Sequence, residues 1–143
     1  PSTACSSLGY APTSPQMAIH NEKGALGEQY ACRFLEDLGY EVLARNWRFG
    51  RDELDIIART ARELVIVEVK TRSSDQHGQP EESVKKGKRS TMIRGANAYV
   101  QATGCELALR FDIVSVILHP GGKPYIHHIS DAFYPTVHER PFK

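Results

Sequence analysis

Three charged side chains, Asp55, Glu68 and Lys70, lie in or directly beside two short stretches rich in Ile, Leu and Val, residues 54–58 and 64–69. Stretches of this length and composition, separated by polar residues, predict the two strands of a β-hairpin. Side chains alternate between the two faces of a strand, so Glu68 and Lys70 share a face. A carboxylate beside an ammonium group on a strand is a combination that could do acid–base or metal chemistry.

The register of this hairpin decides whether Asp55 joins them. Centring the turn on residues 61–62 places Ile57 opposite Ile66 and Asp55 opposite Glu68. Directly opposed residues on antiparallel strands have Cβ atoms about 5 Å apart. The pattern therefore predicts two carboxylates and one ammonium group clustered on one face of a small sheet.

Two carboxylates at this spacing repel each other unless a cation or a shared proton lies between them. Lys70 supplies one positive charge, and hard oxygen ligands of this kind suit Mg²⁺ or Mn²⁺. The alternative is an ordinary salt bridge on a solvated sheet face, because charged cross-strand pairs are common. The metal site is favoured because Ile57, Leu64 and Ile66 share the predicted face, so that the charges emerge at the end of an apolar surface.

The composition is that of one domain with a core of its own, since the chain has 143 residues. Its 18 basic and 17 acidic residues give a formal net charge of +1, so a nucleic-acid surface would have to come from local clustering. Cys5, Cys32 and Cys105 show no paired metal-ligand spacing and are typical of free thiols in a reducing cytoplasm. No apolar run approaches the ~20 residues of a membrane-spanning helix, which predicts a soluble protein.

Hydrophobic periodicity predicts helices over residues 21–38 and 81–103, with Asn21 as the N-cap of the first and Gly39 and Gly104 as the stops. Strands are predicted at residues 40–49, 54–58, 64–69, 107–118 and 125–129, which gives the order α-β-β-β-α-β-β. This order predicts a mixed sheet flanked by helices. Residues 1–20 lack periodicity and are expected to form a disordered extension, residues 21–134 the folded domain, and residues 135–143 a flexible tail.

Several segments between about Gly24 and Phe133 match one known family. They are GALGEQYACRFLEDLGYEVLARNWR, DELDIIA, VIVEVKTR, the helix that contains Lys88, RFDIVSV and HISDAF. On these segments the chain resembles the YraN-like family, also called UPF0102. Its members are predicted endonucleases of the PD-(D/E)xK restriction-endonuclease-like superfamily, related to archaeal Holliday junction resolvases. A Glu-x-Lys element alone would be a weak match, but the segments together are specific.

The resemblance implies the restriction-endonuclease-like α/β fold, with a central mixed β-sheet flanked by helices, and a metal-dependent endonuclease. Mg²⁺ or Mn²⁺ would be held by Asp55, Glu68 and the backbone carbonyl of Val69. Glu28, which belongs to a matching glycine–glutamate pair, would add a further catalytic ligand from the first helix, and Lys70 would complete the catalytic set. By its position alone, at the edge of the helix's apolar stripe, Glu28 is more typical of a solvated residue.

The chain departs from the family pattern just before Asp55. It has Asp52 where relatives usually carry glycine, and the proline of the superfamily's name is missing. Glycine permits backbone angles that aspartate tolerates less well, so the local turn is expected to differ. Glu53 lies on the same predicted face as Asp55 and is either an auxiliary ligand or an exposed first residue of the strand.

Basic residues around these strands predict contacts with DNA phosphates. The alternative is that they form ordinary solvated surfaces. Trp47 is expected to complete the core, and Arg110 is expected to pair with Asp112 in a structural role. Lys88 matches a lysine of the family. The candidate DNA contacts are Arg45, Arg48, Arg51, Arg72, Lys85, Lys86, Lys88 and Arg89.

Three classes of function follow from these patterns. The first is a metal-dependent endonuclease that hydrolyses DNA phosphodiesters, including branched or structured DNA. The second is a nucleic-acid-binding module that keeps the nuclease fold with little or no turnover, and the third is an interaction protein that uses the sheet as a scaffold. DNA is the expected partner and a membrane is not. Symmetric cleavage of a junction would require a homodimer.

Overall fold

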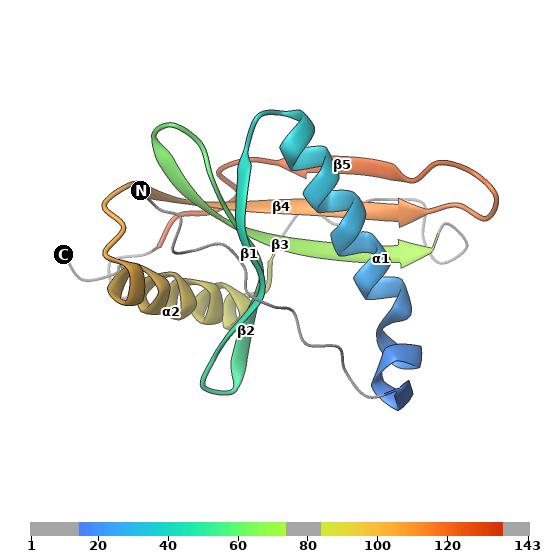
Figure 1. Ribbon diagram of the computed structural model, residues 1–143, viewed down its shortest axis with the longest axis horizontal. Coiled ribbons are helices and arrows are strands. Elements are labelled where there is room, and N and C mark those ends of the chain that lie inside the picture. Colours follow the sequence, from blue (N-terminus) through green and yellow to red (C-terminus); the bar gives the residue numbers. More distant parts are fainter. Residues whose placement is uncertain (1–14, 74–83, 136–143) are drawn as a thin grey trace.

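Two helices cover opposite faces of a five-stranded sheet in the part of the chain that the structure describes (Figure 1). The computed structural model of the protein describes residues 15–73 and 84–135, with the backbone alone for residues 15–23. The elements are α1 (Pro15–Asp37), β1 (Glu41–Phe49), β2 (Asp52–Arg59), β3 (Glu63–Ser73), α2 (Lys86–Thr103), β4 (Ala108–Leu118) and β5 (Tyr125–Ile129). The predicted order of elements is confirmed.

The strands lie in the order β1-β2-β3-β4-β5. β3 and β4 are parallel and are connected through α2, whereas the other neighbouring strands are antiparallel. The sheet is therefore mixed, and the α/β fold agrees with the predicted restriction-endonuclease-like class. Figure 1 shows β1 and β2 running steeply across the direction of β3, β4 and β5, so the β1–β2 ribbon turns away from the rest of the sheet.

Each helix packs on its own hydrophobic core, in which a fully buried Val, Leu, Ile, Phe or Met side chain contributes about 1.5–3 kcal/mol. We call the first the α2-side core; its buried residues are Leu43, Leu54, Ile57, Leu64, Ile66, Val84, Met92, Ile93, Ala96, Tyr99, Phe111 and Ile113. We call the second the α1-side core; its buried residues are Ala31, Cys32, Leu35, Ile56, Ala58, Val65, Val67, Val114 and Val116. β3 alternates between the two cores, as a strand between two helical layers must.

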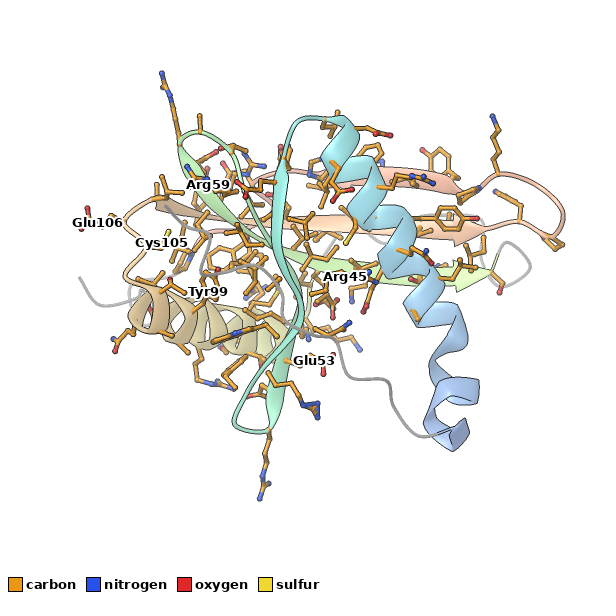
Figure 2. All side chains as sticks on the ribbon, viewed as in Figure 1. Arg45, Glu53, Arg59, Tyr99, Cys105 and Glu106 are labelled. Carbon is orange, nitrogen blue, oxygen red and sulfur yellow. The ribbon has the colours of Figure 1, made fainter. Side chains whose placement is uncertain are left out.

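Trp47 packs on the α2-side core, as expected. Its ring centroid lies 5.3 Å from that of Tyr99 in an edge-to-face arrangement, and Figure 2 shows Tyr99 on the side of the sheet that α2 covers. Trp47 also stacks on Phe49, with ring centroids 5.8 Å apart. The contact with Tyr99 packs Trp47 of β1 against α2.

The helix starts differ from the predictions, whereas the helix ends agree. α1 begins at Pro15, so Asn21 lies inside the helix and its prediction as N-cap is wrong. α2 begins at Lys86, because Lys85 has extended backbone angles (φ −65°, ψ 155°), so the predicted start at residue 81 is also wrong. Gly104 ends α2 in the left-handed conformation at φ 71°. Residues 81–83, and most of the predicted extension and tail, lie outside the described residues.

Cys32 and Cys105 are free thiols, and Cys5 lies outside the described residues. Within the described ranges, neither helix combines the length and the apolar character that crossing a membrane requires.

Candidate active site

The predicted register of the β2–β3 hairpin is confirmed, since Ile57 pairs with Ile66. The ladder between these strands ends at the pair Ile56–Val67. One residue further, the Asp55 carboxylate accepts a hydrogen bond of 2.9 Å from the backbone N–H of Val69. Where β2 turns away from β3, the Val69 N–H therefore bonds to the Asp55 side chain and not to a backbone carbonyl of β2.

This divergence brings together the two carboxyl groups that the sequence singles out. Asp55 and Glu68 hydrogen-bond to each other through their side chains. Burial, and next the charge of Asp55, raise the pKa of Glu68 to about 7, and burial also raises the pKa of Asp55. Glu68 is only 9% exposed. A pair of buried carboxyl groups this close either shares a proton near neutral pH or requires a cation.

Two lysines lie beside the carboxyl pair. Lys88, in the first turn of α2, places its ammonium nitrogen 3.4 Å from Oε1 of Glu68. The positive charge of Lys70 lowers the pKa of both Asp55 and Glu68, as does that of Lys88. The structure thus brings Asp55 and Glu68 together, with the charge of Lys70 close enough to act on both, and Lys88 approaches Glu68 from α2.

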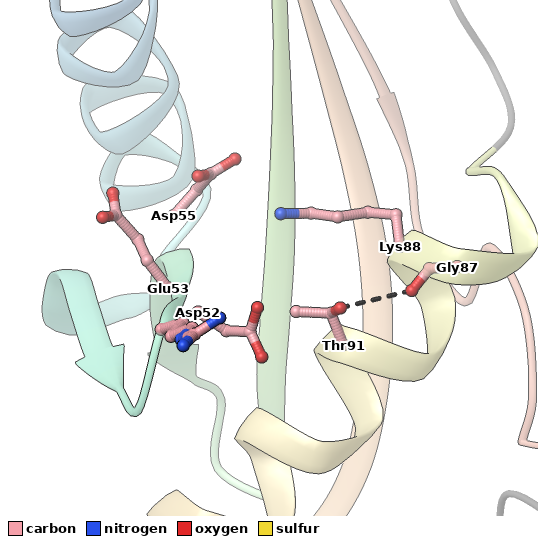
Figure 3. A pocket seen from close by; sticks show the side chains of 7 residues that line it. Asp52, Glu53, Asp55, Gly87, Lys88 and Thr91 are labelled. Carbon is pink, nitrogen blue, oxygen red and sulfur yellow. Dashed lines mark hydrogen bonds between the residues drawn. The ribbon is translucent and has the colours of Figure 1, made fainter.

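An open cavity of about 480 Å³ lies in front of this cluster, between the start of β2 and the start of α2. Figure 3 shows Asp55 and Glu53 on the β2 side, with Lys88 reaching toward them from α2. Thr91 faces the cavity from the next turn of α2 and donates a hydrogen bond of 3.2 Å to the Gly87 carbonyl. The cavity is lined by Arg51, Asp52, Glu53, Asp55, Gly87, Lys88 and Thr91.

Glu28 approaches the carboxyl pair from α1. Burial, and next the charge of Asp55, raise its pKa to about 7, while a hydrogen bond from the Asn46 side chain and the charge of Arg45 lower it. The helix comes this close because Gly27 packs directly on Thr71 of β3, where a Cβ atom would lie 1.9 Å from the threonine hydroxyl oxygen. Glu28 is therefore not a solvated flank residue, and its approach agrees with the resemblance.

The donor set suits a small hard cation that keeps part of its hydration shell. In the described ranges, no group of three or more Asp, Glu, His or Cys side chains is gathered closely enough to hold a metal ion. Mg²⁺ is commonly bound by one or two protein carboxylates with several waters retained, and Asp55 and Glu68 provide two. The Val69 carbonyl belongs to the residue whose N–H already holds Asp55 in place. The oxygen donors that could hold Mg²⁺ or Mn²⁺ are Asp55, Glu68 and the Val69 carbonyl, with Glu28 as a further candidate ligand from α1.

The predicted DNA-contact residues are only partly gathered around the cavity. Arg51 and Lys88 line it, and Arg48 lies beside it in an ion pair of 3.1 Å with Glu53. Arg45 instead lines a groove between α1 and β1 (Figure 2). Lys85 and Lys86 are exposed just before and at the start of α2, Arg72 is half-buried near the end of β3, and Arg89 donates to the Val84 carbonyl at 3.3 Å.

Two residues near the site were not anticipated. Arg94 forms an ion pair of 3.2 Å with Asp52, which ties α2 to the start of β2. Asn46 donates the hydrogen bond to Glu28 and has a left-handed backbone, with φ 51°. The signal that could have found it is an asparagine inside a predicted strand, where this residue type is depleted.

Arg110 and Asp112 pair as predicted, at 2.9 and 2.8 Å. Asp112 is fully buried and also contacts Nε2 of His128 at 2.8 Å. The parallel register places Asp112 beside Val67, whose side chain lies in the α1-side core, so this cluster lies on the other face of the sheet from Glu68. It belongs to the scaffold and not to the candidate active site.

The chain is similar to proteins from several bacterial lineages. It is 49% identical to a UPF0102 protein of Bacteroides thetaiotaomicron over 121 residues, which cover 85% of this chain and 99% of that protein. It is 45% identical to a UPF0102 protein of Porphyromonas gingivalis over 82% of this chain and 87% of that one, and 45% identical to one of Nocardia farcinica over 77% and 87%. Residues 27–116 match the family model, and this range includes Glu28, Asp55, Glu68, Lys70 and Lys88. The chain therefore belongs to the uncharacterised protein family UPF0102.

Proposed function

We propose that this protein is a metal-dependent endonuclease that hydrolyses DNA phosphodiesters at the cavity between β2, β3 and α2. The observation that carries the proposal is the buried contact between the Asp55 and Glu68 carboxyl groups, with two ammonium groups beside them. Placing like charges together in a buried position costs free energy, so such pairs are concentrated at sites that bind a cation or transfer a proton.

In this mechanism Asp55 and Glu68 would hold Mg²⁺ or Mn²⁺ together with the Val69 carbonyl. The ion would supply the charge that polarises a phosphodiester and acidifies a bound water. Lys70 would orient the attacking water or stabilise the charge that develops on the phosphate oxygens. The Val69 N–H keeps Asp55 in one orientation, so little rearrangement of that carboxylate would be needed.

DNA would reach the site from the open side of the cavity. Lys88 and Arg51 line this opening, and Arg48, Lys85 and Lys86 are exposed near it. The first turn of α2 has no acidic residue, and its N-cap residue Lys85 makes no side-chain cap hydrogen bond to the residues that the structure describes. A helix start of this kind favours a bound phosphate. Branched DNA is the substrate that the resemblance to junction resolvases favours, and two-strand cleavage would involve a homodimer.

The test is cleavage of linear, single-stranded, flapped and four-way DNA with Mg²⁺ or Mn²⁺. Asp55→Asn, Glu68→Gln and Lys70→Met should each lower the rate by about 100-fold or more, because each removes a group that acts in the transition state. Glu36→Gln, on the exposed side of α1, is the matched control and should cut normally. DNA binding should survive in the three variants when measured by fluorescence anisotropy in Ca²⁺.

The rival function, a nucleic-acid-binding module, gives a different result. Wild type and Asp55→Asn would then bind DNA equally, and neither would cut any substrate with either metal. Cleavage that persists in all three active-site variants would assign the activity to another site or to a contaminant.

A further inference from the structure

Asn46 has a backbone conformation that is unusual inside a strand. Its φ is 51°, and among the described residues only Asp131 shares a positive φ without being glycine. Asparagine enters the left-handed region more readily than most residues, but the conformation still stores strain. Strained residues persist where the surrounding structure requires them, and they are concentrated at functional sites.

The left-handed residue reverses the alternation of β1. In a regular strand, residues two apart share a face. Arg45 lines the groove beneath α1, whereas Trp47 packs on the α2-side core. The strand therefore changes faces at Asn46.

β2 changes faces at the same level. Ile56 lies in the α1-side core, and Leu54, two residues earlier, lies in the α2-side core. The change is centred on Asp55. Arg45 pairs with Ile56 and Trp47 pairs with Leu54, so Asn46 lies across from Asp55. The regular pairing of β1 with β2 is interrupted between these two pairs, where Asn46 faces Asp55, and at this level Asp55 bonds to β3 through its side chain.

The Asn46 side chain interacts with Glu28, a second carboxyl group close to Asp55. It donates a hydrogen bond to the Glu28 carboxylate, which α1 brings close to Asp55. Asn46 therefore lies beside β2, the strand that carries Asp55. It also hydrogen-bonds to Glu28, the carboxyl group that α1 brings close to Asp55.

We propose that Asn46 is a positioning residue of the candidate site. Its left-handed backbone turns the β1–β2 ribbon so that Asp55 reaches the gap between β2 and β3, and its side-chain amide holds Glu28 beside Asp55. The second role rests on the proposed function, because it concerns the affinity of the site for a divalent cation. The first role concerns the fold and stands without it.

Two substitutions separate these roles. Asn46→Gly keeps the left-handed backbone at no steric cost but removes the amide, whereas Asn46→Ala removes the amide and strains the backbone. We expect Asn46→Gly to melt about 5 °C above Asn46→Ala. Arg48 is the matched control, since it lies two residues further along β1 and in the ordinary range of φ. There the order should reverse, with Arg48→Ala more stable than Arg48→Gly.

The amide is tested by Mn²⁺ affinity, measured by titration calorimetry or electron paramagnetic resonance of the free ion. Asn46→Gly should bind Mn²⁺ about 10-fold more weakly than wild type, which is the usual effect of losing a residue that orients a ligand. The same substitution in a Glu28→Gln background should cause no further loss, because the amide acts through Glu28.

Unchanged Mn²⁺ affinity in Asn46→Gly would overturn the second role. An Asn46→Ala protein at least as stable as Asn46→Gly would overturn the first. A wild-type protein that binds no Mn²⁺ would overturn the proposed function and the second role with it, while the comparison of alanine with glycine would still decide the first.

Discussion

Lys88 reaches from the first turn of α2 to within 3.4 Å of Glu68 on β3, and so places a cation of the protein beside the candidate metal ligands. The Glu68 side chain is 11% exposed and that of Lys88 34%, so the ion pair lies at the inner edge of the open cavity. Its charge lowers the pKa of both Glu68 and Asp55, against the effect of burial. Lys88 thus compensates part of the charge that a divalent ion would otherwise neutralise.

Replacing Lys88 should strengthen metal binding and slow the cleavage of DNA. In Lys88→Met the repulsion between ammonium and metal is lost, and we expect Mn²⁺ to bind about fivefold more tightly, equivalent to roughly 1 kcal/mol. Cleavage should nevertheless become slower, because the cavity loses a contact for the phosphate. Mn²⁺ titration and DNA cleavage measure the two effects, with Lys123→Met, at an exposed lysine between β4 and β5, as control. A loss of Mn²⁺ affinity in Lys88→Met would contradict this role.

The stability of the metal-free protein should fall as the pH rises from about 4.5 to about 7. The pKa of Glu68 is about 7 in the folded protein and ordinarily 4.5, so in this window the folded state binds more protons than the unfolded chain. The full shift corresponds to a loss on the order of 3 kcal/mol in the free energy of unfolding. Urea denaturation at pH 5 and pH 8 measures it. Glu68→Gln should be more stable than wild type at pH 8 and show a flatter dependence, whereas Glu36→Gln should follow wild type.

Divalent cations should offset the loss of stability at high pH. The ion competes with protons for the carboxyl groups, so Mn²⁺ should raise the melting temperature more at pH 8 than at pH 5. The gain should vanish in Glu68→Gln. An equal gain at both pH values, or one that Glu68→Gln retains, would place the ion elsewhere on the protein.

Close packing of α1 on β3 should be as important to the site as its charged residues. Gly27→Ala would place a Cβ atom 1.9 Å from Oγ1 and 2.8 Å from Cβ of Thr71, so the helix must move away from the strand and carry Glu28 with it. Overpacking of this kind costs about 1–3 kcal/mol. Gly24→Ala is the matched control, because no atom of the described residues lies within 4 Å of its added Cβ and alanine favours a helix. Thermal melts and Mn²⁺ titrations of the two variants should diverge, and equal behaviour would mean that the Gly27 contact is not needed.

The parts of the site that follow from alternation and register could be predicted from sequence. Pairing Ile57 with Ile66 requires only the lengths of two apolar strands, and it brings Asp55 toward Glu68. The face change at Asn46 could not be predicted in this way, because it breaks the alternation on which the argument depends. The hydrogen bond from the Val69 N–H to Asp55 follows from that break, since only a strand that diverges from its neighbour leaves a backbone amide for a side chain.

The start of α2 could not be predicted for a different reason. Lys85 and Lys86 are good helix formers, and nothing in the sequence between residues 81 and 86 indicates that the helix should start only at Lys86. Val84 is nevertheless 5% exposed and belongs to the α2-side core, and Lys85 is extended, so tertiary packing sets the first residue of the helix. This start matters to the site because it places Lys88 in the first turn, within reach of Glu68.

The buried ion pair on the other face should affect stability without affecting metal binding. Burial alone would raise the pKa of Asp112, but hydrogen bonds from His128, Arg110 and the Asp131 amide lower it below its ordinary 3.8. The contribution of Asp112 to stability is therefore present above about pH 4 and lost as the pH falls through the lowered value. Asp112→Asn leaves the Arg110 guanidinium, whose side chain is 14% exposed, without the charge of its main partner.

We expect Asp112→Asn to lower the free energy of unfolding by about 3–5 kcal/mol at pH 7, the usual cost of breaking a buried ion pair. Urea denaturation measures the loss, and Arg48→Ala, which breaks the exposed pair with Glu53, should cost less than about 1 kcal/mol. Protein that remains folded should bind Mn²⁺ as wild type does, because Asp112 faces α1 while Glu68 faces α2. A large change in Mn²⁺ affinity would mean that the two charged clusters communicate through β3 and β4, and Asp112 would then belong to the site.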